Sequence, residues 1–339
     1  IRSLRQQDIF SIVIFSDRAQ VLIPASLQHD LRKMETKVRM LLPDGGTEIF
    51  QGLEAGLAEV RKNLSPDRVN HVVLLTDGQT YGDEDAALNL AKEVEKQGIG
   101  ISGLGVGKDW NDDFLDDLAA KTGSSSRYIA KPQEIRTFLE EKFKQLAKVF
   151  AENITLSYQQ PDHVELSYIF RLQPNTAHLF AEERIPLGIL LRDQPLRLLL
   201  EFKVNPKAVV EDEVNLLRGT LHFDIPSQSP GAKVMRVKVA RKVTENASLE
   251  PPSPTLIHAL ANLNLYRMQE KAQDEAENGQ YEEASRRLQN LATHLLSHGE
   301  QSMAKTVLFE AENLRQKQRF SEEGRKQMEY GTRALLLPS

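Results

Sequence analysis

The chain has 339 residues, of which 40% are hydrophobic and 27% are charged, so it can build packed cores and lacks the composition of a disordered protein. Its 43 Lys and Arg residues against 48 Asp and Glu give a formal net charge of -5, which argues against nucleic-acid binding because phosphate recognition needs a basic surface. The absence of cysteine excludes disulfide bonds, a thiolate zinc site and a cysteine nucleophile. No apolar run is long enough to span a membrane.

Residues 1–150 alternate short β-branched runs with helical patterns. Gly98 marks the end of one helix and Asn111 the start of another, and residues 20–23 look like an antiparallel edge strand ended by Pro24. This alternation predicts a doubly wound, mostly parallel α/β sheet. The predicted strands cover residues 9–15, 72–75, 99–106 and 127–130, and the predicted amphipathic helices cover residues 49–64 and 83–97.

The rest of the chain divides into two further predicted parts. Residues 151–249 show a period of two with turn residues between the runs, which predicts an antiparallel β-sandwich of six or seven strands. A proline-rich linker then leads into residues 250–339, which read as a helical tail. Gly279 and Gly299 open two similar helical segments, but two weak copies are fewer than a stable repeat array needs. The strands of the second part are expected near residues 154–158, 164–168, 196–202, 217–223 and 234–239.

The residues best suited to chemistry are Thr47 and Asp77. Thr47 follows Pro43-Asp44-Gly45-Gly46 just before a helix, and Asp77 ends the apolar strand of the Leu74–Gly78 motif. The carboxyl edge of an open α/β sheet is where ligands bind, and a hydroxyl and a carboxylate suit Mg²⁺ or Mn²⁺. The alternative is that Thr47 caps the helix and Asp77 caps the next turn, with Gly78 supplying a positive φ.

Six motifs follow one another along the first segment: Asp8–Phe15, Gly45–Thr47, Leu74–Gly78, Gly98-Ile99, Gly103–Gly107 and Leu118–Gly123. Together they resemble a von Willebrand factor type A domain that is entered part way through its first helix. The resemblance implies that Thr47 and Asp77 belong to a metal-ion-dependent adhesion site. It also implies that an acidic residue of a partner protein completes the coordination of the metal, so that the metal serves recognition and no bond is broken.

One departure from the family pattern concerns metal binding. The Asp-x-Ser-x-Ser motif of the family, which follows its first strand, does not occur upstream of Asp8. Two protein oxygens cannot hold a hard cation that takes six or more ligands, so the chain by itself is expected to bind Mg²⁺ or Mn²⁺ weakly or not at all. We expect the first strand and its ligands to lie in a segment that precedes Ile1, and the chain to be less stable than the domain extended by that segment.

Other motifs have simpler explanations than a site. Gly103–Gly107 lacks the G-x-G-x-x-G spacing of a dinucleotide fingerprint, so its glycines are expected to permit close packing. His294 and His298 lack a third ligand nearby, and the acidic residues around Trp110 suit a helix N-terminus. Neither G-x-S-x-G nor a phosphate loop occurs.

The function predicted from these observations is a metal-dependent protein-interaction or adhesion module and not an enzyme. Two alternatives remain: a metal-free structural scaffold with a degenerate site, and an α/β hydrolytic enzyme whose nucleophile cannot be named. A type A domain followed by a β-sandwich and a helical tail is also similar to uncharacterised bacterial proteins, and the ending Lys326–Arg333 resembles theirs. The lack of cysteine and of a signal segment favours the cytoplasm, although any signal would lie before Ile1.

Overall fold

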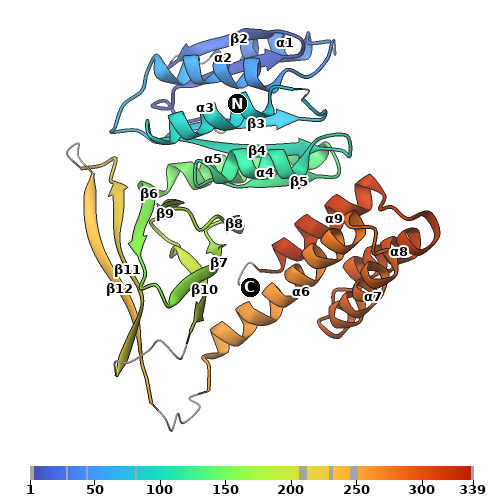
Figure 1. Ribbon diagram of the computed structural model, residues 1–339. Coiled ribbons are helices and arrows are strands. Elements are labelled where there is room, and N and C mark those ends of the chain that lie inside the picture. The colour runs from blue at the N-terminus through green and yellow to red at the C-terminus, as the bar shows by residue number, and fades with distance from the viewer. Residues whose placement is uncertain are drawn as a thin grey trace. The chain divides into compact units, whose positions relative to one another are not determined.

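The structure is a computed structural model that describes residues 4–27, 30–42, 45–80, 82–205, 212–228, 232–244 and 251–336. It divides into two compact units. The first unit comprises Ile1–Pro174 and His178–Lys242 and holds the α/β segment together with the antiparallel sheets (Figure 1). The second unit comprises Asn175–Ala177 and Val243–Ser339 and holds the helical tail.

The α/β segment has the predicted alternation of strands and helices. Strands β3, β4 and β5 form a parallel sheet, and β1 pairs with β2 in a separate antiparallel sheet. The antiparallel edge strand is thereby confirmed, but it runs through Pro24 to Ser26, because an edge strand tolerates the missing N–H of proline. In chain order the elements are β1 (Phe10–Phe15), β2 (Ala19–Ser26), α1 (Leu31–Arg39), α2 (Ile49–Arg61), β3 (Asn70–Thr76), α3 (Glu84–Glu95), β4 (Ile99–Val106), α4 (Asp112–Ala120), β5 (Ser126–Ile129) and α5 (Gln133–Ala147).

Close packing of α4 on β4 explains the glycines of β4. A Cβ on Gly103 would stand 2.4 Å from Cγ of Leu115, and a Cβ on Gly105 would stand 2.0 Å from Cε2 of Trp110. Trp110 is almost fully buried, and its indole N–H donates to the carbonyl of Gly107 at 2.9 Å. Gly103 therefore admits Leu115 of α4 and Gly105 admits Trp110 of the loop before α4, which is the close packing that the sequence favoured over nucleotide binding.

The second part consists of antiparallel strands, as its alternating sequence pattern predicts, and these strands form two sheets. One has the strand order β12-β11-β6-β9 and the other β10-β7-β8. The sequence did not predict β9, because Pro186 and Gly188 interrupt its apolar run, and Gly188 has a φ of 92°. The strands are β6 (Val149–Gln159), β7 (Val164–Gln173), β8 (Ala177–Leu179), β9 (Arg184–Leu191), β10 (Arg197–Val204), β11 (Glu213–Asp224) and β12 (Lys233–Lys242).

Arg171 joins the antiparallel sheets to the α/β segment inside the first unit. Its side chain is 2% exposed and donates to the carbonyl oxygens of Gly123 at 2.5 Å, Ser124 at 2.7 Å and Leu187 at 2.8 Å. A buried guanidinium needs such acceptors, because burying an unpaired charge is costly. These bonds tie β7 and β9 to the loop that follows α4.

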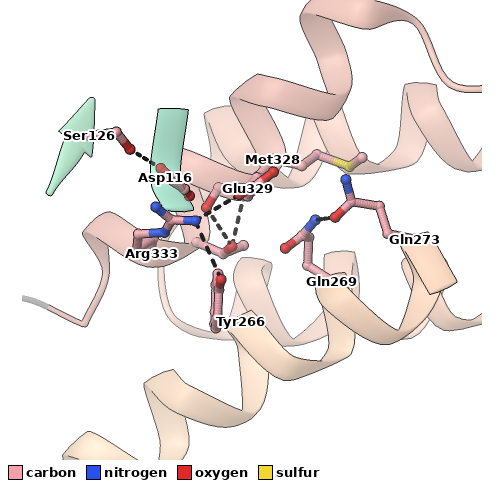
Figure 2. A network of polar contacts seen from close by, with 9 residues as sticks. Asp116, Ser126, Tyr266, Gln269, Gln273, Met328, Glu329 and Arg333 are labelled. Atoms are coloured by element: carbon pink, nitrogen blue, oxygen red, sulfur yellow. Dashed lines mark hydrogen bonds and ion pairs between the residues drawn. The ribbon is translucent and has the colours of Figure 1, made fainter. Parts of the chain in front are cut away.

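The helical unit consists of α6 (Pro254–Glu277), α7 (Tyr281–Ser297), α8 (Gln301–Lys317) and α9 (Glu322–Ala334), which confirms the predicted helical tail. Gly279 and Gly299, with φ of 78° and 84°, make the turns on either side of α7. Figure 2 shows that the interior also holds polar groups: Arg333 donates to Glu329 at 2.7 Å and to the hydroxyl of Tyr266 at 3.5 Å. Among the described residues, no helix is long and apolar enough to cross a membrane.

Candidate functional site

A groove separates β1 from β3 in the first unit. β1 pairs with β2, and β3 pairs with β4. No described strand lies between β1 and β3. The groove has a volume of about 1980 Å³ and is lined by successive residues of both strands. Leu75 of β3 is 42% exposed, which is unusual for an apolar side chain in a strand of a parallel sheet. The gap agrees with the predicted type A sheet that lacks its first strand.

Thr47 and Asp77 both line the groove, at the end where β3 terminates. A Cβ on Gly78 would stand 2.7 Å from Oγ1 of Thr47, so the threonine hydroxyl packs directly on the residue that follows Asp77. The prediction of a positive φ at Gly78 is wrong, because its backbone is not in the left-handed region. Glycine is needed there for the close approach of Thr47.

The N-terminus of α2 is capped by residues far along the chain and not by Thr47. The hydroxyl of Thr80 accepts from the amide of Ile49 at 3.1 Å, and the carboxylate of Asp83 accepts from the amide of Phe50 at 2.8 Å. The N-cap residue itself, Glu48, makes no side-chain capping bond. The alternative reading of Thr47 as a helix cap is therefore wrong, and its hydroxyl is available at the groove.

The turn after β3 is likewise closed without Asp77. The hydroxyl of Thr76 accepts from the amide of Gly78 at 3.3 Å and donates to the carbonyl of the same residue at 3.0 Å. Asp77 is exposed, and within the described part of the chain its carboxylate makes no hydrogen bond or ion pair. The turn thus leaves the Asp77 carboxylate free to meet a ligand.

The loop that carries Thr47 is held by Ser16 and Asp17, two residues that belong to none of the predicted site motifs. The carboxylate of Asp17 accepts from the amide of Gly46 at 2.6 Å, and the carbonyl of Ser16 accepts from the amide of Glu48 at 2.8 Å. Both residues directly follow β1, so the signal was a polar pair at the end of an apolar strand. Pro43 and Asp44, the first residues of the predicted motif, lie outside the described residues.

The side chains of Thr47 and Asp77 are chemically suited to bind a hard divalent cation, but two ligands are too few to hold one. Thr47 and Asp77 offer a hydroxyl and a carboxylate, as Mg²⁺ and Mn²⁺ prefer. Mg²⁺ takes about six oxygen ligands, some of them water. Over the described ranges, no three His, Asp or Glu side chains come together in a way that could hold a metal. Thr47 and Asp77 therefore supply only part of the oxygen ligands that such a cation takes.

Two of the acidic residues near Trp110, Asp112 and Asp113, lie in the first turn of α4, where the helix dipole favours negative charge. The side chain of Asn111 caps this helix by accepting from the amide of Phe114 at 3.1 Å, and Ser126 donates to Asp116 (Figure 2). Burial raises the pKa of Asp117, opposed by Lys121 and reinforced by Asp116. His294 and His298 lie in the last turn and at the C-cap of α7, and both are exposed.

Two family models match the chain. The model for the von Willebrand factor type A domain matches residues 1–152. The model for the Sll0103-like, C-terminal alpha-helical domain matches residues 254–338. A solved von Willebrand factor type A protein from Catenulispora acidiphila covers 98% of this chain with 82% of its own length, at a TM-score of 0.72 and 17% identity. That identity supports a shared fold alone.

Two bacterial proteins are similar to this chain in sequence. The uncharacterized protein sll0103 of Synechocystis sp. is 30% identical over 209 residues, which are 59% of this chain and 50% of that protein. The uncharacterized protein YfbK of Escherichia coli is 21% identical over 223 residues, which are 63% of this chain and 38% of that protein. The chain thus spans half or less of the length of these relatives.

The parallel sheet, the order of the motifs and the family match all concern the same segment. Residues 1–152 of this chain form a von Willebrand factor type A domain, and the helices that follow the antiparallel sheets match the model of the Sll0103-like, C-terminal alpha-helical domain.

Proposed function

We propose that this chain is part of a protein-interaction module that recognises its partner through a divalent cation, Mg²⁺ or Mn²⁺, held near Thr47 and Asp77. The observation that carries the proposal is that the polar groups of both side chains are not engaged in the local hydrogen bonds of the fold. Thr80 and Asp83 cap α2, and Thr76 closes the turn after β3, so among the described residues neither the Thr47 hydroxyl nor the Asp77 carboxylate is used to cap a helix or close a turn. A hydroxyl and a carboxylate kept apart from structural bonds at one sheet edge are well placed to bind a ligand.

The groove supports a site that is completed by one more strand. An extended segment between β1 and β3 would pair with the free edges of both strands and would end near Thr47 and Asp77. Oxygen-bearing residues at the end of that strand would raise the number of protein ligands toward that which a hard cation takes. A position left open on the metal would then accept a carboxylate from a partner protein.

The test uses the protein extended upstream of Ile1, with Mg²⁺ affinity measured by calorimetry. Thr47→Ala and Asp77→Asn are each expected to weaken Mg²⁺ binding by at least about tenfold, since each removes one ligand or its charge. Thr36→Ala in α1 and Asp85→Asn in α3 are matched controls, because both lie on exposed helix surfaces outside the groove. Cross-linking with and without EDTA then reports whether partner binding follows the metal.

A metal-free scaffold is the second candidate, favoured by the small number of oxygens that the described residues bring together. If the extended protein binds no Mg²⁺ or Mn²⁺, and if Thr47→Ala leaves every interaction unchanged, the scaffold replaces the first proposal. We propose further that the protein catalyses no reaction. Turnover of any substrate that disappears with Asp77→Asn would contradict that part. A cytoplasmic location remains a prediction.

A further inference from the structure

Strand β12 lies at an open edge of the four-stranded antiparallel sheet. The strand order is β12-β11-β6-β9, and no described strand continues the sheet beyond β12 (Figure 1). In an antiparallel ladder, every second residue of an edge strand points its N–H and C=O groups away from the sheet. With 10 residues, β12 is long for an exposed edge, so it offers a row of backbone groups to an incoming strand.

The same edge is strongly basic. Half of the residues of β12 are basic and none is acidic, although the whole chain carries a net charge of -5. The basic residues are Lys233, Arg236, Lys238, Arg241 and Lys242. Two copies of such an edge repel each other, so the charge disfavours pairing between identical chains. It favours a segment of opposite charge.

The neighbouring strand shows how a carboxylate behaves on this surface. The register places Arg218 of β11 opposite Lys238 and Glu213 opposite Lys242, and Glu213 forms an ion pair with Lys238. The hydrogen bond from Lys238 lowers the pKa of Glu213, and the nearby charges of Arg218 and Lys242 add to this effect. The surface therefore stabilises the charged form of a carboxylate on it.

We propose that β12 accepts an acidic, extended segment of a partner protein as an additional antiparallel or parallel strand of this sheet. A polypeptide fits better than a nucleic acid or a lipid surface, because only another backbone can pair with the N–H and C=O groups of the edge. Two exposed apolar side chains support this choice. Val234 is 60% exposed and Met235 is 50% exposed, and neighbouring residues of a strand point to opposite faces of the sheet. A partner strand could thus contact one apolar side chain on each face while its acidic residues meet the basic ones.

The experiment measures binding of a fluorescein-labelled peptide of alternating Glu and Val residues, about ten residues long to match β12, to the full chain by fluorescence anisotropy. The double variant Arg236→Glu and Lys242→Glu is expected to weaken binding by at least about tenfold, and rising salt is expected to weaken binding to the unaltered chain. Lys305→Glu, an exposed charge reversal on α8, is the matched control and is expected to leave binding unchanged.

Backbone pairing is tested with two peptides of the same sequence, N-methylated on the odd or on the even residues. Strand addition predicts that one of the two loses binding and the other keeps it, because only alternate amides face β12. Equal binding of both, or equal binding of a proline-interrupted peptide of the same charge, would show plain charge attraction and overturn the proposal. Absence of peptide binding, or a clear preference for duplex DNA or for phosphatidylserine vesicles, would overturn it as well. The cation site is not involved, so EDTA should have no effect.

Discussion

At the scale of single residues, two glycines allow side chains of neighbouring loops to pack against β4 and against the turn after β3. Gly105 faces Trp110 and Gly78 faces Thr47, and neither has the positive φ that sequence reasoning first associates with glycine. Both positions are occupied by glycine because a Cβ would collide with a neighbouring side chain. The distinction matters, since a collision depends on a partner elsewhere in the fold and a turn does not.

Replacement of Gly105 by alanine is therefore expected to destabilise the first unit by about 1–3 kcal/mol, because Trp110 is buried and cannot move aside. The free energy of unfolding, measured by urea titration, checks this. Gly56→Ala is the matched control: it lies inside α2 with open space around it, and it should stabilise the protein by about 0.5–1 kcal/mol. Equal effects of the two changes would contradict the explanation.

The candidate site was only partly predictable at this scale. Thr47 and Asp77 were found because each lies beside a recognisable local signal, a glycine pair before a helix and an apolar run. The bonds from Thr80 and Asp83 to the start of α2 could not be found in this way. They join residues more than thirty positions apart, and no local pattern encodes such a separation.

At the scale of elements, the junction of α8 and α9 depends on one buried carboxylate. Glu310 is fully buried in α8 and accepts from the amide of Ser321 at 2.7 Å and from its hydroxyl at 2.6 Å. Ser321 in turn caps α9 by accepting from the amide of Gly324. A Cβ on Gly324 would stand 2.1 Å from Oε1 of Glu310, so the carboxylate also requires glycine in the first turn of α9.

Glu310→Ala is expected to destabilise the helical unit by about 2–4 kcal/mol, because it removes a buried acceptor and leaves the donors of Ser321 unpaired. Helical circular dichroism during thermal unfolding measures the effect. Glu312→Ala removes an exposed carboxylate from the same helix and should change the stability by no more than about 0.5 kcal/mol. A loss of the same size in both variants would show that helix propensity, and not the buried contact, is responsible.

At the scale of the whole first unit, several ionisable groups are buried in its interior. Burial lowers the pKa of Lys142 to about 7, and the charge of Arg171 adds to the shift. Burial raises the pKa of Glu152 to about 8, and the neighbouring Asp224 adds to it. The pKa of His71 is lowered well below its usual value by burial and by Lys142. The stability of this unit should therefore depend on pH.

Because of Glu152, the stability of the first unit is expected to fall as the pH rises. Its folded-state pKa of about 8 exceeds the usual value of 4.5, so the folded state holds the proton more tightly. The stability that Glu152 contributes is complete below about pH 4.5 and is lost as the pH rises toward 8. Glu152→Gln, which stays neutral, should be close to wild type at pH 5 and more stable by about 2–4 kcal/mol at pH 9.

Urea unfolding at a series of pH values measures this difference. Glu165→Gln serves as the control, because Glu165 lies on β7 with most of its side chain exposed, and it should show no such trend. A gap between Glu152→Gln and wild type that does not widen with pH would mean that Glu152 is not held in its neutral form.

The amino-acid sequence by itself determined the type and order of most elements, the chemistry of Thr47 and Asp77 and the family of the first segment. These follow from local periodicity and from residues near one another in the chain. The tertiary structure decided which groups cap α2, that Gly78 serves packing, where β9 pairs and which edges of β1 and β3 stay open. Such features depend on contacts between residues that are distant in sequence, and only the folded backbone brings those residues together.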